Sequence, residues 1–227
     1  MSRQPRPVLE NVPLHIIQRG NNRNPCFFAP ADYQIYLALL AEAASAHGCS
    51  VHAYVLMTNH IHVLATPAET TSPARMMKSV GERYVQYVNR RYKRHGTLWQ
   101  GRFHSCLVDS DQYFLVCQRY IELNPVRAAM TAHPADYDWS SYRANAHGVR
   151  DRVITPHIIY TGIAAAETER QASYRALFQE VIPETMLKQV RHATSRDAAF
   201  GSSSFVDDMG VALGRDLTCR PPGRRCQ

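Results

Sequence analysis

The sequence predicts an α+β fold in which strands and helices follow one another in the order β-α-β-β-α-β. Three patterns support this prediction. Short apolar segments are bounded by turn residues, which is typical of strands. Two longer segments repeat apolar residues at helical spacing, and each ends at a glycine, Gly48 or Gly96. Two strand segments are separated only by Thr58 and Asn59, which predicts a β-hairpin.

The expected elements follow in chain order. Asp32 can cap the first helix, and Ser110 can cap the last helix of the unit, which is expected to stop near Pro125. An order of this kind is the ferredoxin-like arrangement, an antiparallel sheet with helices packed on one face. The expected strands are 13–20, 50–57, 60–66 and 103–108, and the expected helices are 29–48, 73–96 and 111–124.

The composition becomes looser after about residue 144. Residues 172–193 are expected to form one helix, and 195–215 two short helices. The basic stretch 219–227 is expected to be a mobile tail. We therefore expect one domain over residues 1–150 and a mostly helical C-terminal extension over 151–227.

Charge and composition limit the classes of function. The chain has 227 residues, is 45% hydrophobic, and carries a net charge of +7 with a pI of about 9.2. This excess of positive charge favours a polyanionic partner, and it favours nucleic acid over a membrane surface. No uncharged apolar run reaches the roughly 18 residues that span a bilayer, and the N-terminus has no apolar signal core, so a cytoplasmic protein is expected.

The cysteines argue against two kinds of structural site. The chain has six cysteines and no C-x-x-C pair. A structural zinc site and a disulfide framework are therefore not expected. We expect reduced, mostly buried thiols.

The stretch TNHIHVLAT places two histidines in an expected strand whose other residues are mostly apolar, as is typical of a buried strand. Side chains two apart on a strand point the same way, with Cα atoms ~6.6 Å apart. His60 and His62 therefore share one face and can converge on a divalent cation. An H-x-H pattern also occurs by chance, so this pair alone does not establish a metal site.

The helix expected at 111–124 carries a row of side chains on one face. Tyr113, Cys117, Tyr120 and Asn124 recur at intervals of three or four residues. If this helix crosses the sheet face that carries the histidines, it brings a phenol beside the metal site. A phenol can attack a polarised phosphodiester and form a covalent phosphotyrosine. The alternatives are a core tyrosine at Tyr120 and an Asn124-Pro125 helix start.

Several segments together resemble the REP-associated tyrosine transposases, which belong to the single-tyrosine HUH transposases. The resemblance covers roughly residues 10–145, and its motifs are specific in their order and spacing. They are HIIQRGNNRNPCFF, HAYVLMTNHIHVL, the segment from MMKSVGERY to LWQGRFHSCLVDSDQY, CQRYIELNPVRAAM and DYDWSSYRA.

The resemblance implies a ferredoxin-like catalytic core, within residues 1–150, that cleaves single-stranded DNA at short hairpin repeats. It implies His60 and His62 as ligands of Mg²⁺ or Mn²⁺, Tyr120 as the nucleophile, and Asn124 as a third ligand. It also implies a nucleoid-associated protein that acts as a monomer or a homodimer.

Basic residues and one tryptophan are candidate DNA contacts. Arginines suit phosphate contacts, and an aromatic ring can stack a base of a single strand. The alternatives are solvated charges and a core tryptophan. The candidates are Arg19, Arg23, Trp99, Arg102, Arg119 and Arg127.

Two other functions remain open on the sequence. One is a DNA-binding regulator with an idle catalytic site. The other is a metal-dependent phosphodiesterase that uses water, which would need a further strong ligand or base near the histidines.

Overall fold

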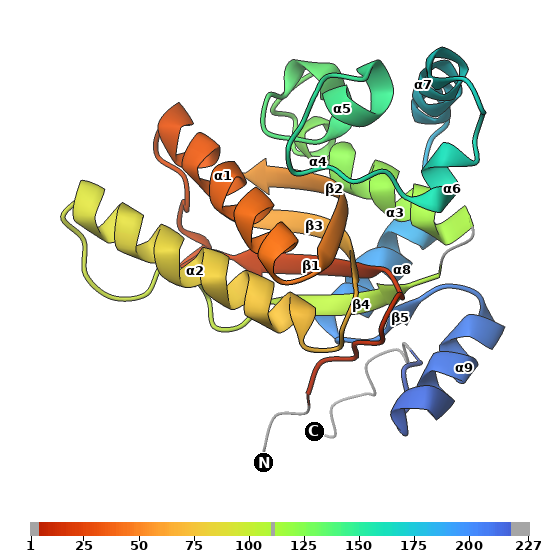
Figure 1. Cartoon of the computed structure of the whole chain (residues 1–227), viewed down its shortest axis with the longest axis horizontal. Helices are drawn as coiled ribbons and strands as arrows, with labels where there is room; N and C mark the ends of the chain where they lie inside the picture. The colour runs from red at the N-terminus through yellow and green to blue at the C-terminus, as the bar shows by residue number, and fades with distance from the viewer. Residues whose placement is uncertain (1–4, 110–111, 219–227) are drawn as a thin grey trace, which may run out of the picture.

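A five-stranded sheet forms the centre of the molecule in the computed structural model, which describes residues 5–109 and 112–218 (Figure 1). The strand order is β2-β3-β1-β4-β5, and all neighbouring pairs are antiparallel except β4 and β5. The strands are β1 (Leu14–Arg19), β2 (Cys49–Met57), β3 (His60–Pro67), β4 (His104–Val108) and β5 (Ala199–Phe200).

Two long helices, α1 (Pro30–Ala46) and α2 (Ser72–Arg91), cover one face of the sheet. Alternate residues of each strand point into this layer. Ile16 of β1 and Ile61 and Val63 of β3 are fully buried there, packed with the apolar stripes of both helices. The ferredoxin-like prediction is confirmed by this arrangement, and the parallel strand β5 extends it.

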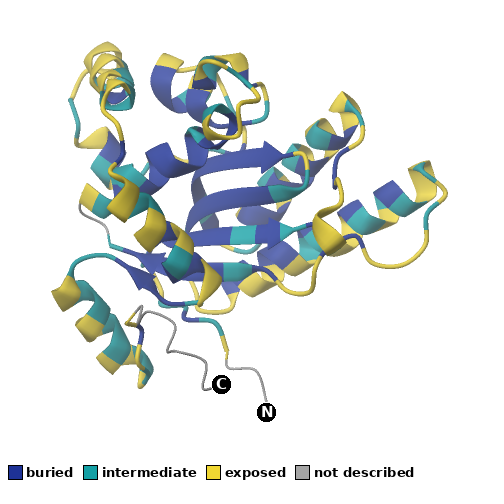
Figure 2. Cartoon of the chain, turned by 180° about the vertical axis from the view of Figure 1, so that it is seen from behind, coloured by how far each residue is buried: buried dark blue, intermediate teal, exposed yellow. Residues whose placement is uncertain are grey.

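The opposite face is covered by α3 (Gln112–Glu122) and α8 (Glu184–Ser195). Val55 and Leu64 are fully buried there beside Phe114 of α3, and Cys106 and Val190 pack in the same cluster. Seen from behind, the strands are dark blue, whereas both helices show exposed outer faces (Figure 2). The sheet is therefore sandwiched between two helical layers.

The two outer antiparallel strands, β4 and β2, are both bonded to further segments of the chain. β5 pairs with β4 through two residues. On the other side, the backbone of β2 exchanges hydrogen bonds with Trp139 and Ser141 and accepts one from Thr155. Short helices connect the remaining segments: η1 (Asn21–Arg23), α4 (Asn124–Arg127), η2 (Pro134–Asp136), α5 (Tyr142–His147), α6 (Ile158–Thr161), α7 (Glu167–Ala176), η3 (Leu177–Gln179) and α9 (Ser203–Leu213).

The structure corrects two helix ends in the N-terminal part. α1 begins at Pro30, so Asp32 lies inside its first turn and accepts hydrogen bonds from the backbone N–H groups of Phe28 and Ala29. α2 ends at Arg91, five residues before Gly96, so the predicted basic helix end continues as a loop. The Ser110 cap lies outside the described residues.

The C-terminal predictions were partly wrong. The single helix expected over 172–193 is two helices, α7 and α8, separated by η3 and by an extended segment that includes Pro183. A proline lacks the backbone N–H that a helix interior needs. In place of two short helices after residue 195 there are a strand, β5, and a helix, α9. The tail 219–227 lies outside the described residues, and the division near residue 150 stays a prediction.

Two further expectations concern cysteines and membranes. Cys26, Cys49, Cys106 and Cys117 are buried. None of the helices within residues 5–109 and 112–218 combines the length and apolar character needed to span a bilayer.

A buried carboxyl group ties α3 to the C-terminal part. Glu122 is fully buried and accepts hydrogen bonds from the Ser141 hydroxyl, the Asn145 amide and the Tyr174 hydroxyl at 2.6, 2.8 and 2.8 Å. Burial raises the pKa of Glu122 to about 7. The three hydrogen-bond donors act in the opposite direction, because they favour the ionised carboxylate and lower its pKa. Tyr174 lies on α7, so this network fixes the position of α7 relative to α3.

The raised pKa of Glu122 predicts a pH dependence of stability. The folded state binds the Glu122 proton more tightly than the unfolded state, whose pKa is near 4.5. The stability contribution of Glu122 therefore falls as pH rises from about 4.5 to about 7 and is then constant. Urea unfolding should show that the wild type loses roughly 2 kcal/mol relative to E122Q between pH 5 and pH 8. Parallel pH profiles for the two proteins would contradict this prediction.

Candidate active site

A cleft of about 1060 Å³ opens on the sheet face that carries α3 and α8. Side chains reach it from β1, β3, the segment before β4, the α3–α4 region and α8. No aspartate or glutamate lines it among the described residues. The lining residues are His15, Ile17, Arg19, His60, His62, Gln100, Gly101, Arg102, His104, Tyr120, Asn124, Arg127, Lys188, Arg191, His192, Thr194 and Ser195.

The two histidines of β3 lie side by side in this cleft, as strand alternation predicts. Their ring centroids are 5.1 Å apart, with an interplanar angle of 76°. Burial, with a smaller effect of the Arg19 charge, lowers the pKa of His60 to about 4. Burial, and to a smaller extent the neighbouring His15 and His60, lower the pKa of His62 well below its ordinary value. Both imidazoles are therefore neutral at neutral pH, which is the form that binds metal ions.

The neighbour of His60 determines which of its ring nitrogens is protonated. Nδ1 of His60 lies 2.7 Å from Oδ1 of Asn59, whose Nδ2 donates to the Arg23 carbonyl at 3.0 Å. Because this oxygen can only accept, Nδ1 of His60 carries the proton and Nε2 carries the lone pair. His62 Nδ1 lies 2.8 Å from Nε2 of His15, a residue of β1.

The phenol ring of Tyr120 lies beside the histidines. Its centroid is 5.8 Å from that of His62 and 5.7 Å from that of His15. The guanidinium of Arg127 lies 4.5 Å from the Tyr120 ring centroid. Tyr120 is 5% exposed yet lines the cleft, so α3 does cross the histidine face of the sheet.

Asn124 belongs to α4 rather than to α3, because α3 ends at Glu122. Its Nδ2 donates to the carbonyl oxygens of Tyr120 at 2.9 Å and Ile121 at 3.3 Å. The predicted helix start is therefore present, but Leu123 is the N-cap residue. With Nδ2 engaged by carbonyls, the amide oxygen is the atom that Asn124 can offer to a cation.

These donors fit a divalent metal. Each imidazole keeps one nitrogen in a hydrogen bond to a neighbouring side chain, the usual arrangement around histidine ligands. The set adds one amide oxygen, and no cluster of three or more His, Cys, Asp or Glu side chains that could hold a metal occurs within the described ranges. Two nitrogens and one neutral oxygen suit a weakly held ion with open coordination positions.

The predicted DNA contacts divide into two groups. Arg19, Arg102 and Arg127 line the cleft. Arg23 is exposed near the β2–β3 turn, outside the cleft lining. Arg119 is 7% exposed and donates to the Glu180 carbonyl, so it is not brought to the cleft.

Trp99, the candidate for base stacking, lies in the core. Its side chain is 6% exposed. Its ring centroid lies 6.2 Å from that of Tyr36 and 6.1 Å from that of Tyr84. A base cannot stack on a ring enclosed in this way. The alternative of a core tryptophan therefore holds for this residue.

Several cleft residues were not identified in the sequence. His15 lies between Leu14 and Ile16 on β1, so alternation alone places it on the polar face. Lys188 and Arg191 reach the cleft from α8, and no sequence signal placed that helix on the sheet.

The family of the chain is established by comparison with family models. The model described as "Transposase IS200 like" matches residues 8–124, which include His60, His62, Tyr120 and Asn124. The chain belongs to the IS200-like transposase family. This IS200-like transposase is therefore an enzyme of the class that the sequence motifs indicated.

Solved structures support the fold of this transposase. A REP-associated tyrosine transposase bound to a REP hairpin is similar, with a TM-score of 0.55, 17% identity, and coverage of 70% of this chain and 93% of that one. A candidate transposase from Deinococcus radiodurans R1 gives 18% identity over 53% of this chain and 96% of that one, but its TM-score of 0.37 is too low to support an argument. No curated protein matches the sequence.

Proposed function

We propose that the chain is a metal-dependent, single-stranded DNA endonuclease and strand transferase that acts on short hairpin repeats. The observation that carries this proposal is the position of Tyr120 beside His60 and His62 in one basic cleft. All three residues belong to the same chain, so one chain holds a complete set.

The proposed reaction is a transesterification at phosphorus. The Tyr120 oxygen forms a bond to phosphorus while the bond to the 3′ oxygen breaks. The phenol proton passes through water to the leaving oxygen, and the products are a 5′-phosphotyrosine and a free 3′-OH. Attack of a 3′-OH on the phosphotyrosine reverses the bonding and joins strands without another energy source.

His60, His62 and Asn124 would hold Mg²⁺ or Mn²⁺. A bound divalent ion polarises the phosphate and stabilises the departing oxygen. The protein keeps the two imidazoles neutral by burial and holds Asn124 through the Tyr120 carbonyl. The guanidinium of Arg127 packs over the ring of Tyr120.

Hairpin DNA is proposed as the partner for two reasons. The cleft contains five Lys and Arg side chains and lacks carboxylates among the described residues, which suits a phosphate backbone. The similar REP-associated transposase is bound to a REP hairpin in its structure. Such a substrate would place the protein at the nucleoid.

The nucleophile can be tested with Tyr120→Phe. Loss of the hydroxyl should abolish both cleavage and the covalent adduct with a labelled hairpin oligonucleotide in Mg²⁺, while hairpin binding stays within about twofold because the ring remains. Denaturing gels measure the adduct, and fluorescence anisotropy measures binding.

Tyr113→Phe is the matched control on the same helix. Tyr113 contacts Phe200 and does not line the cleft, so cleavage should be unchanged. Cleavage by Tyr120→Phe would indicate attack by water, and a wild type that never forms an adduct would indicate an idle regulator.

The metal ligands can be tested by binding of Mn²⁺. The double variant His60→Ala/His62→Ala should lose Mn²⁺ binding in electron paramagnetic resonance titrations and should lose Mg²⁺-dependent cleavage. His133→Ala/His147→Ala changes two histidines outside the cleft and should leave both properties intact. Full activity of the first variant with chelator present would refute the metal role.

Lys188 and Arg191 are expected to contact phosphate, although they lie outside the segment matched by the family model. Lys188→Gln/Arg191→Gln should lower the salt dependence of hairpin binding by up to about 1.4 in the slope of log K against log salt. Arg75→Gln/Lys78→Gln, on the exposed surface of α2, is the charge-matched control. Equal slopes for the two double variants would contradict a role of α8 in binding.

A further inference from the structure

We propose that Thr194 of α8 and His15 of β1 form a hydrogen-bond relay that fixes the tautomer of His62 and leaves its Nε2 lone pair available for the metal. The relay deepens the proposed function and rests on it for the role of the metal. It makes Thr194 and His15 positioning residues, because neither needs to contact the metal or the DNA.

The direction of the relay begins at the Thr194 hydroxyl. This oxygen lies 2.8 Å from the Val190 carbonyl oxygen, 2.9 Å from Nδ1 of His15 and 3.2 Å from Sγ of Cys106. Of these three partners, only the carbonyl is unable to donate. The hydroxyl proton therefore points to Val190, as is common for threonine within a helix. The Thr194 oxygen then accepts a hydrogen bond from Nδ1–H of His15.

His15 passes this constraint to His62. The His15 side chain is buried in a cleft that no carboxylate lines among the described residues, and a neutral imidazole carries one proton. That proton is on Nδ1, so Nε2 of His15 has only a lone pair. At 2.8 Å it accepts from Nδ1–H of His62. The two rings are stacked, with centroids 5.0 Å apart and an interplanar angle of 13°.

The consequence is the same tautomer for both candidate ligands. His62 carries its proton on Nδ1 because of His15, and His60 carries its proton on Nδ1 because of Asn59. Each ring therefore keeps its Nε2 lone pair. Reversal of one hydrogen bond in the relay would put a proton on the nitrogen that has to bind the metal.

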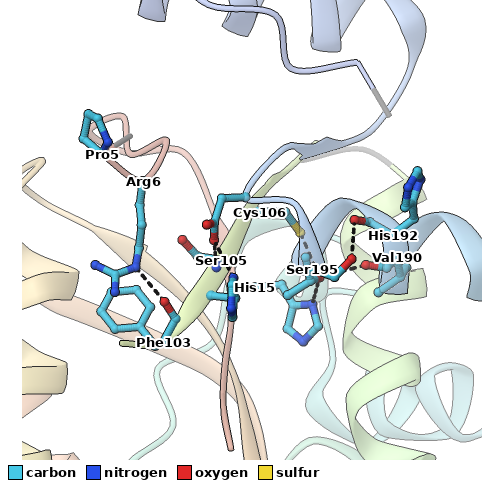
Figure 3. A network of polar contacts seen from close by, with 12 residues as sticks. Pro5, Arg6, His15, Phe103, Ser105, Cys106, Val190, His192 and Ser195 are labelled. Atoms are coloured by element: carbon cyan, nitrogen blue, oxygen red, sulfur yellow. Dashed lines mark hydrogen bonds and ion pairs between the residues drawn. The ribbon is translucent and has the colours of Figure 1, made fainter. Parts of the chain in front are cut away.

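The position of Thr194 depends on the packing of α8. Val190, Ala193 and Thr194 form its buried side. In Figure 3, His15 and Cys106 approach the turn of α8 that carries Val190, His192 and Ser195. The family model ends at residue 124, so this part of the relay comes from a segment that the family resemblance does not cover.

The experiment compares Thr194→Val with Thr194→Ser. Valine has nearly the shape of threonine but cannot accept from His15, whereas serine keeps the hydroxyl. Long-range ¹⁵N–¹H correlation spectra of the metal-free protein report the tautomer of each histidine. Wild type and T194S should show His62 with the proton on Nδ1 alone, and T194V should show a mixture of both tautomers.

Mn²⁺ titration provides the second readout. The affinity of T194V should fall by about 10- to 100-fold, the usual effect of losing a partner of a ligating histidine, while T194S stays near wild type. Cys106→Ala, which removes the other neighbour of the hydroxyl, should behave like wild type in both measurements.

Three results would overturn the relay: a wild-type His62 protonated on Nε2, a T194V spectrum identical to wild type, or a T194S protein that behaves like T194V. The spectra need no metal and no DNA. A wild type that binds no Mn²⁺ but shows the expected tautomers would therefore refute the metal in the proposed function and leave the relay supported.

Discussion

The alternation of side chains along β3 is the constraint on which the rest of the structure depends. Ile61 and Val63 are fully buried against the α1 and α2 layer, and this burial fixes the register of the strand. His60 and His62 are consequently held on the other face. A shift of one residue would exchange the two sets, placing imidazoles in the core and apolar side chains in the cleft.

Several charged and polar groups that this fold buries are bonded to partners from distant parts of the chain. Asp32 accepts from the hydroxyls of Tyr87 and Tyr92, and Glu122 accepts from three donors in the following segments. His15 bonds to Thr194, 179 residues later. Unpaired polar groups in such positions would cost stability, so these bonds make the arrangement of the layers specific.

Local patterns in the sequence were sufficient for the four strands β1 to β4, for helices α1 to α3 and for the positions of His60, His62 and Tyr120. Alternation and helical spacing act within one element, so a single sequence contains this information. The burial of Trp99 and Arg119 depends on packing between distant elements, which local patterns do not describe. The same holds for α8, because the pattern at 172–193 indicates a helix but not its break before Glu184 or the sheet face that it covers.

The covered outer side of β2 has a consequence for self-association. An open edge strand offers a row of unpaired N–H and C=O groups to a second molecule. Here β5 contributes only two residues beside β4, and irregular segments near Trp139, Ser141 and Thr155 occupy the outer side of β2. A continuous sheet formed through β2 of two copies would require the segments on its outer side to be displaced. Two copies that associate without this displacement would therefore leave the sheet of each unextended at β2.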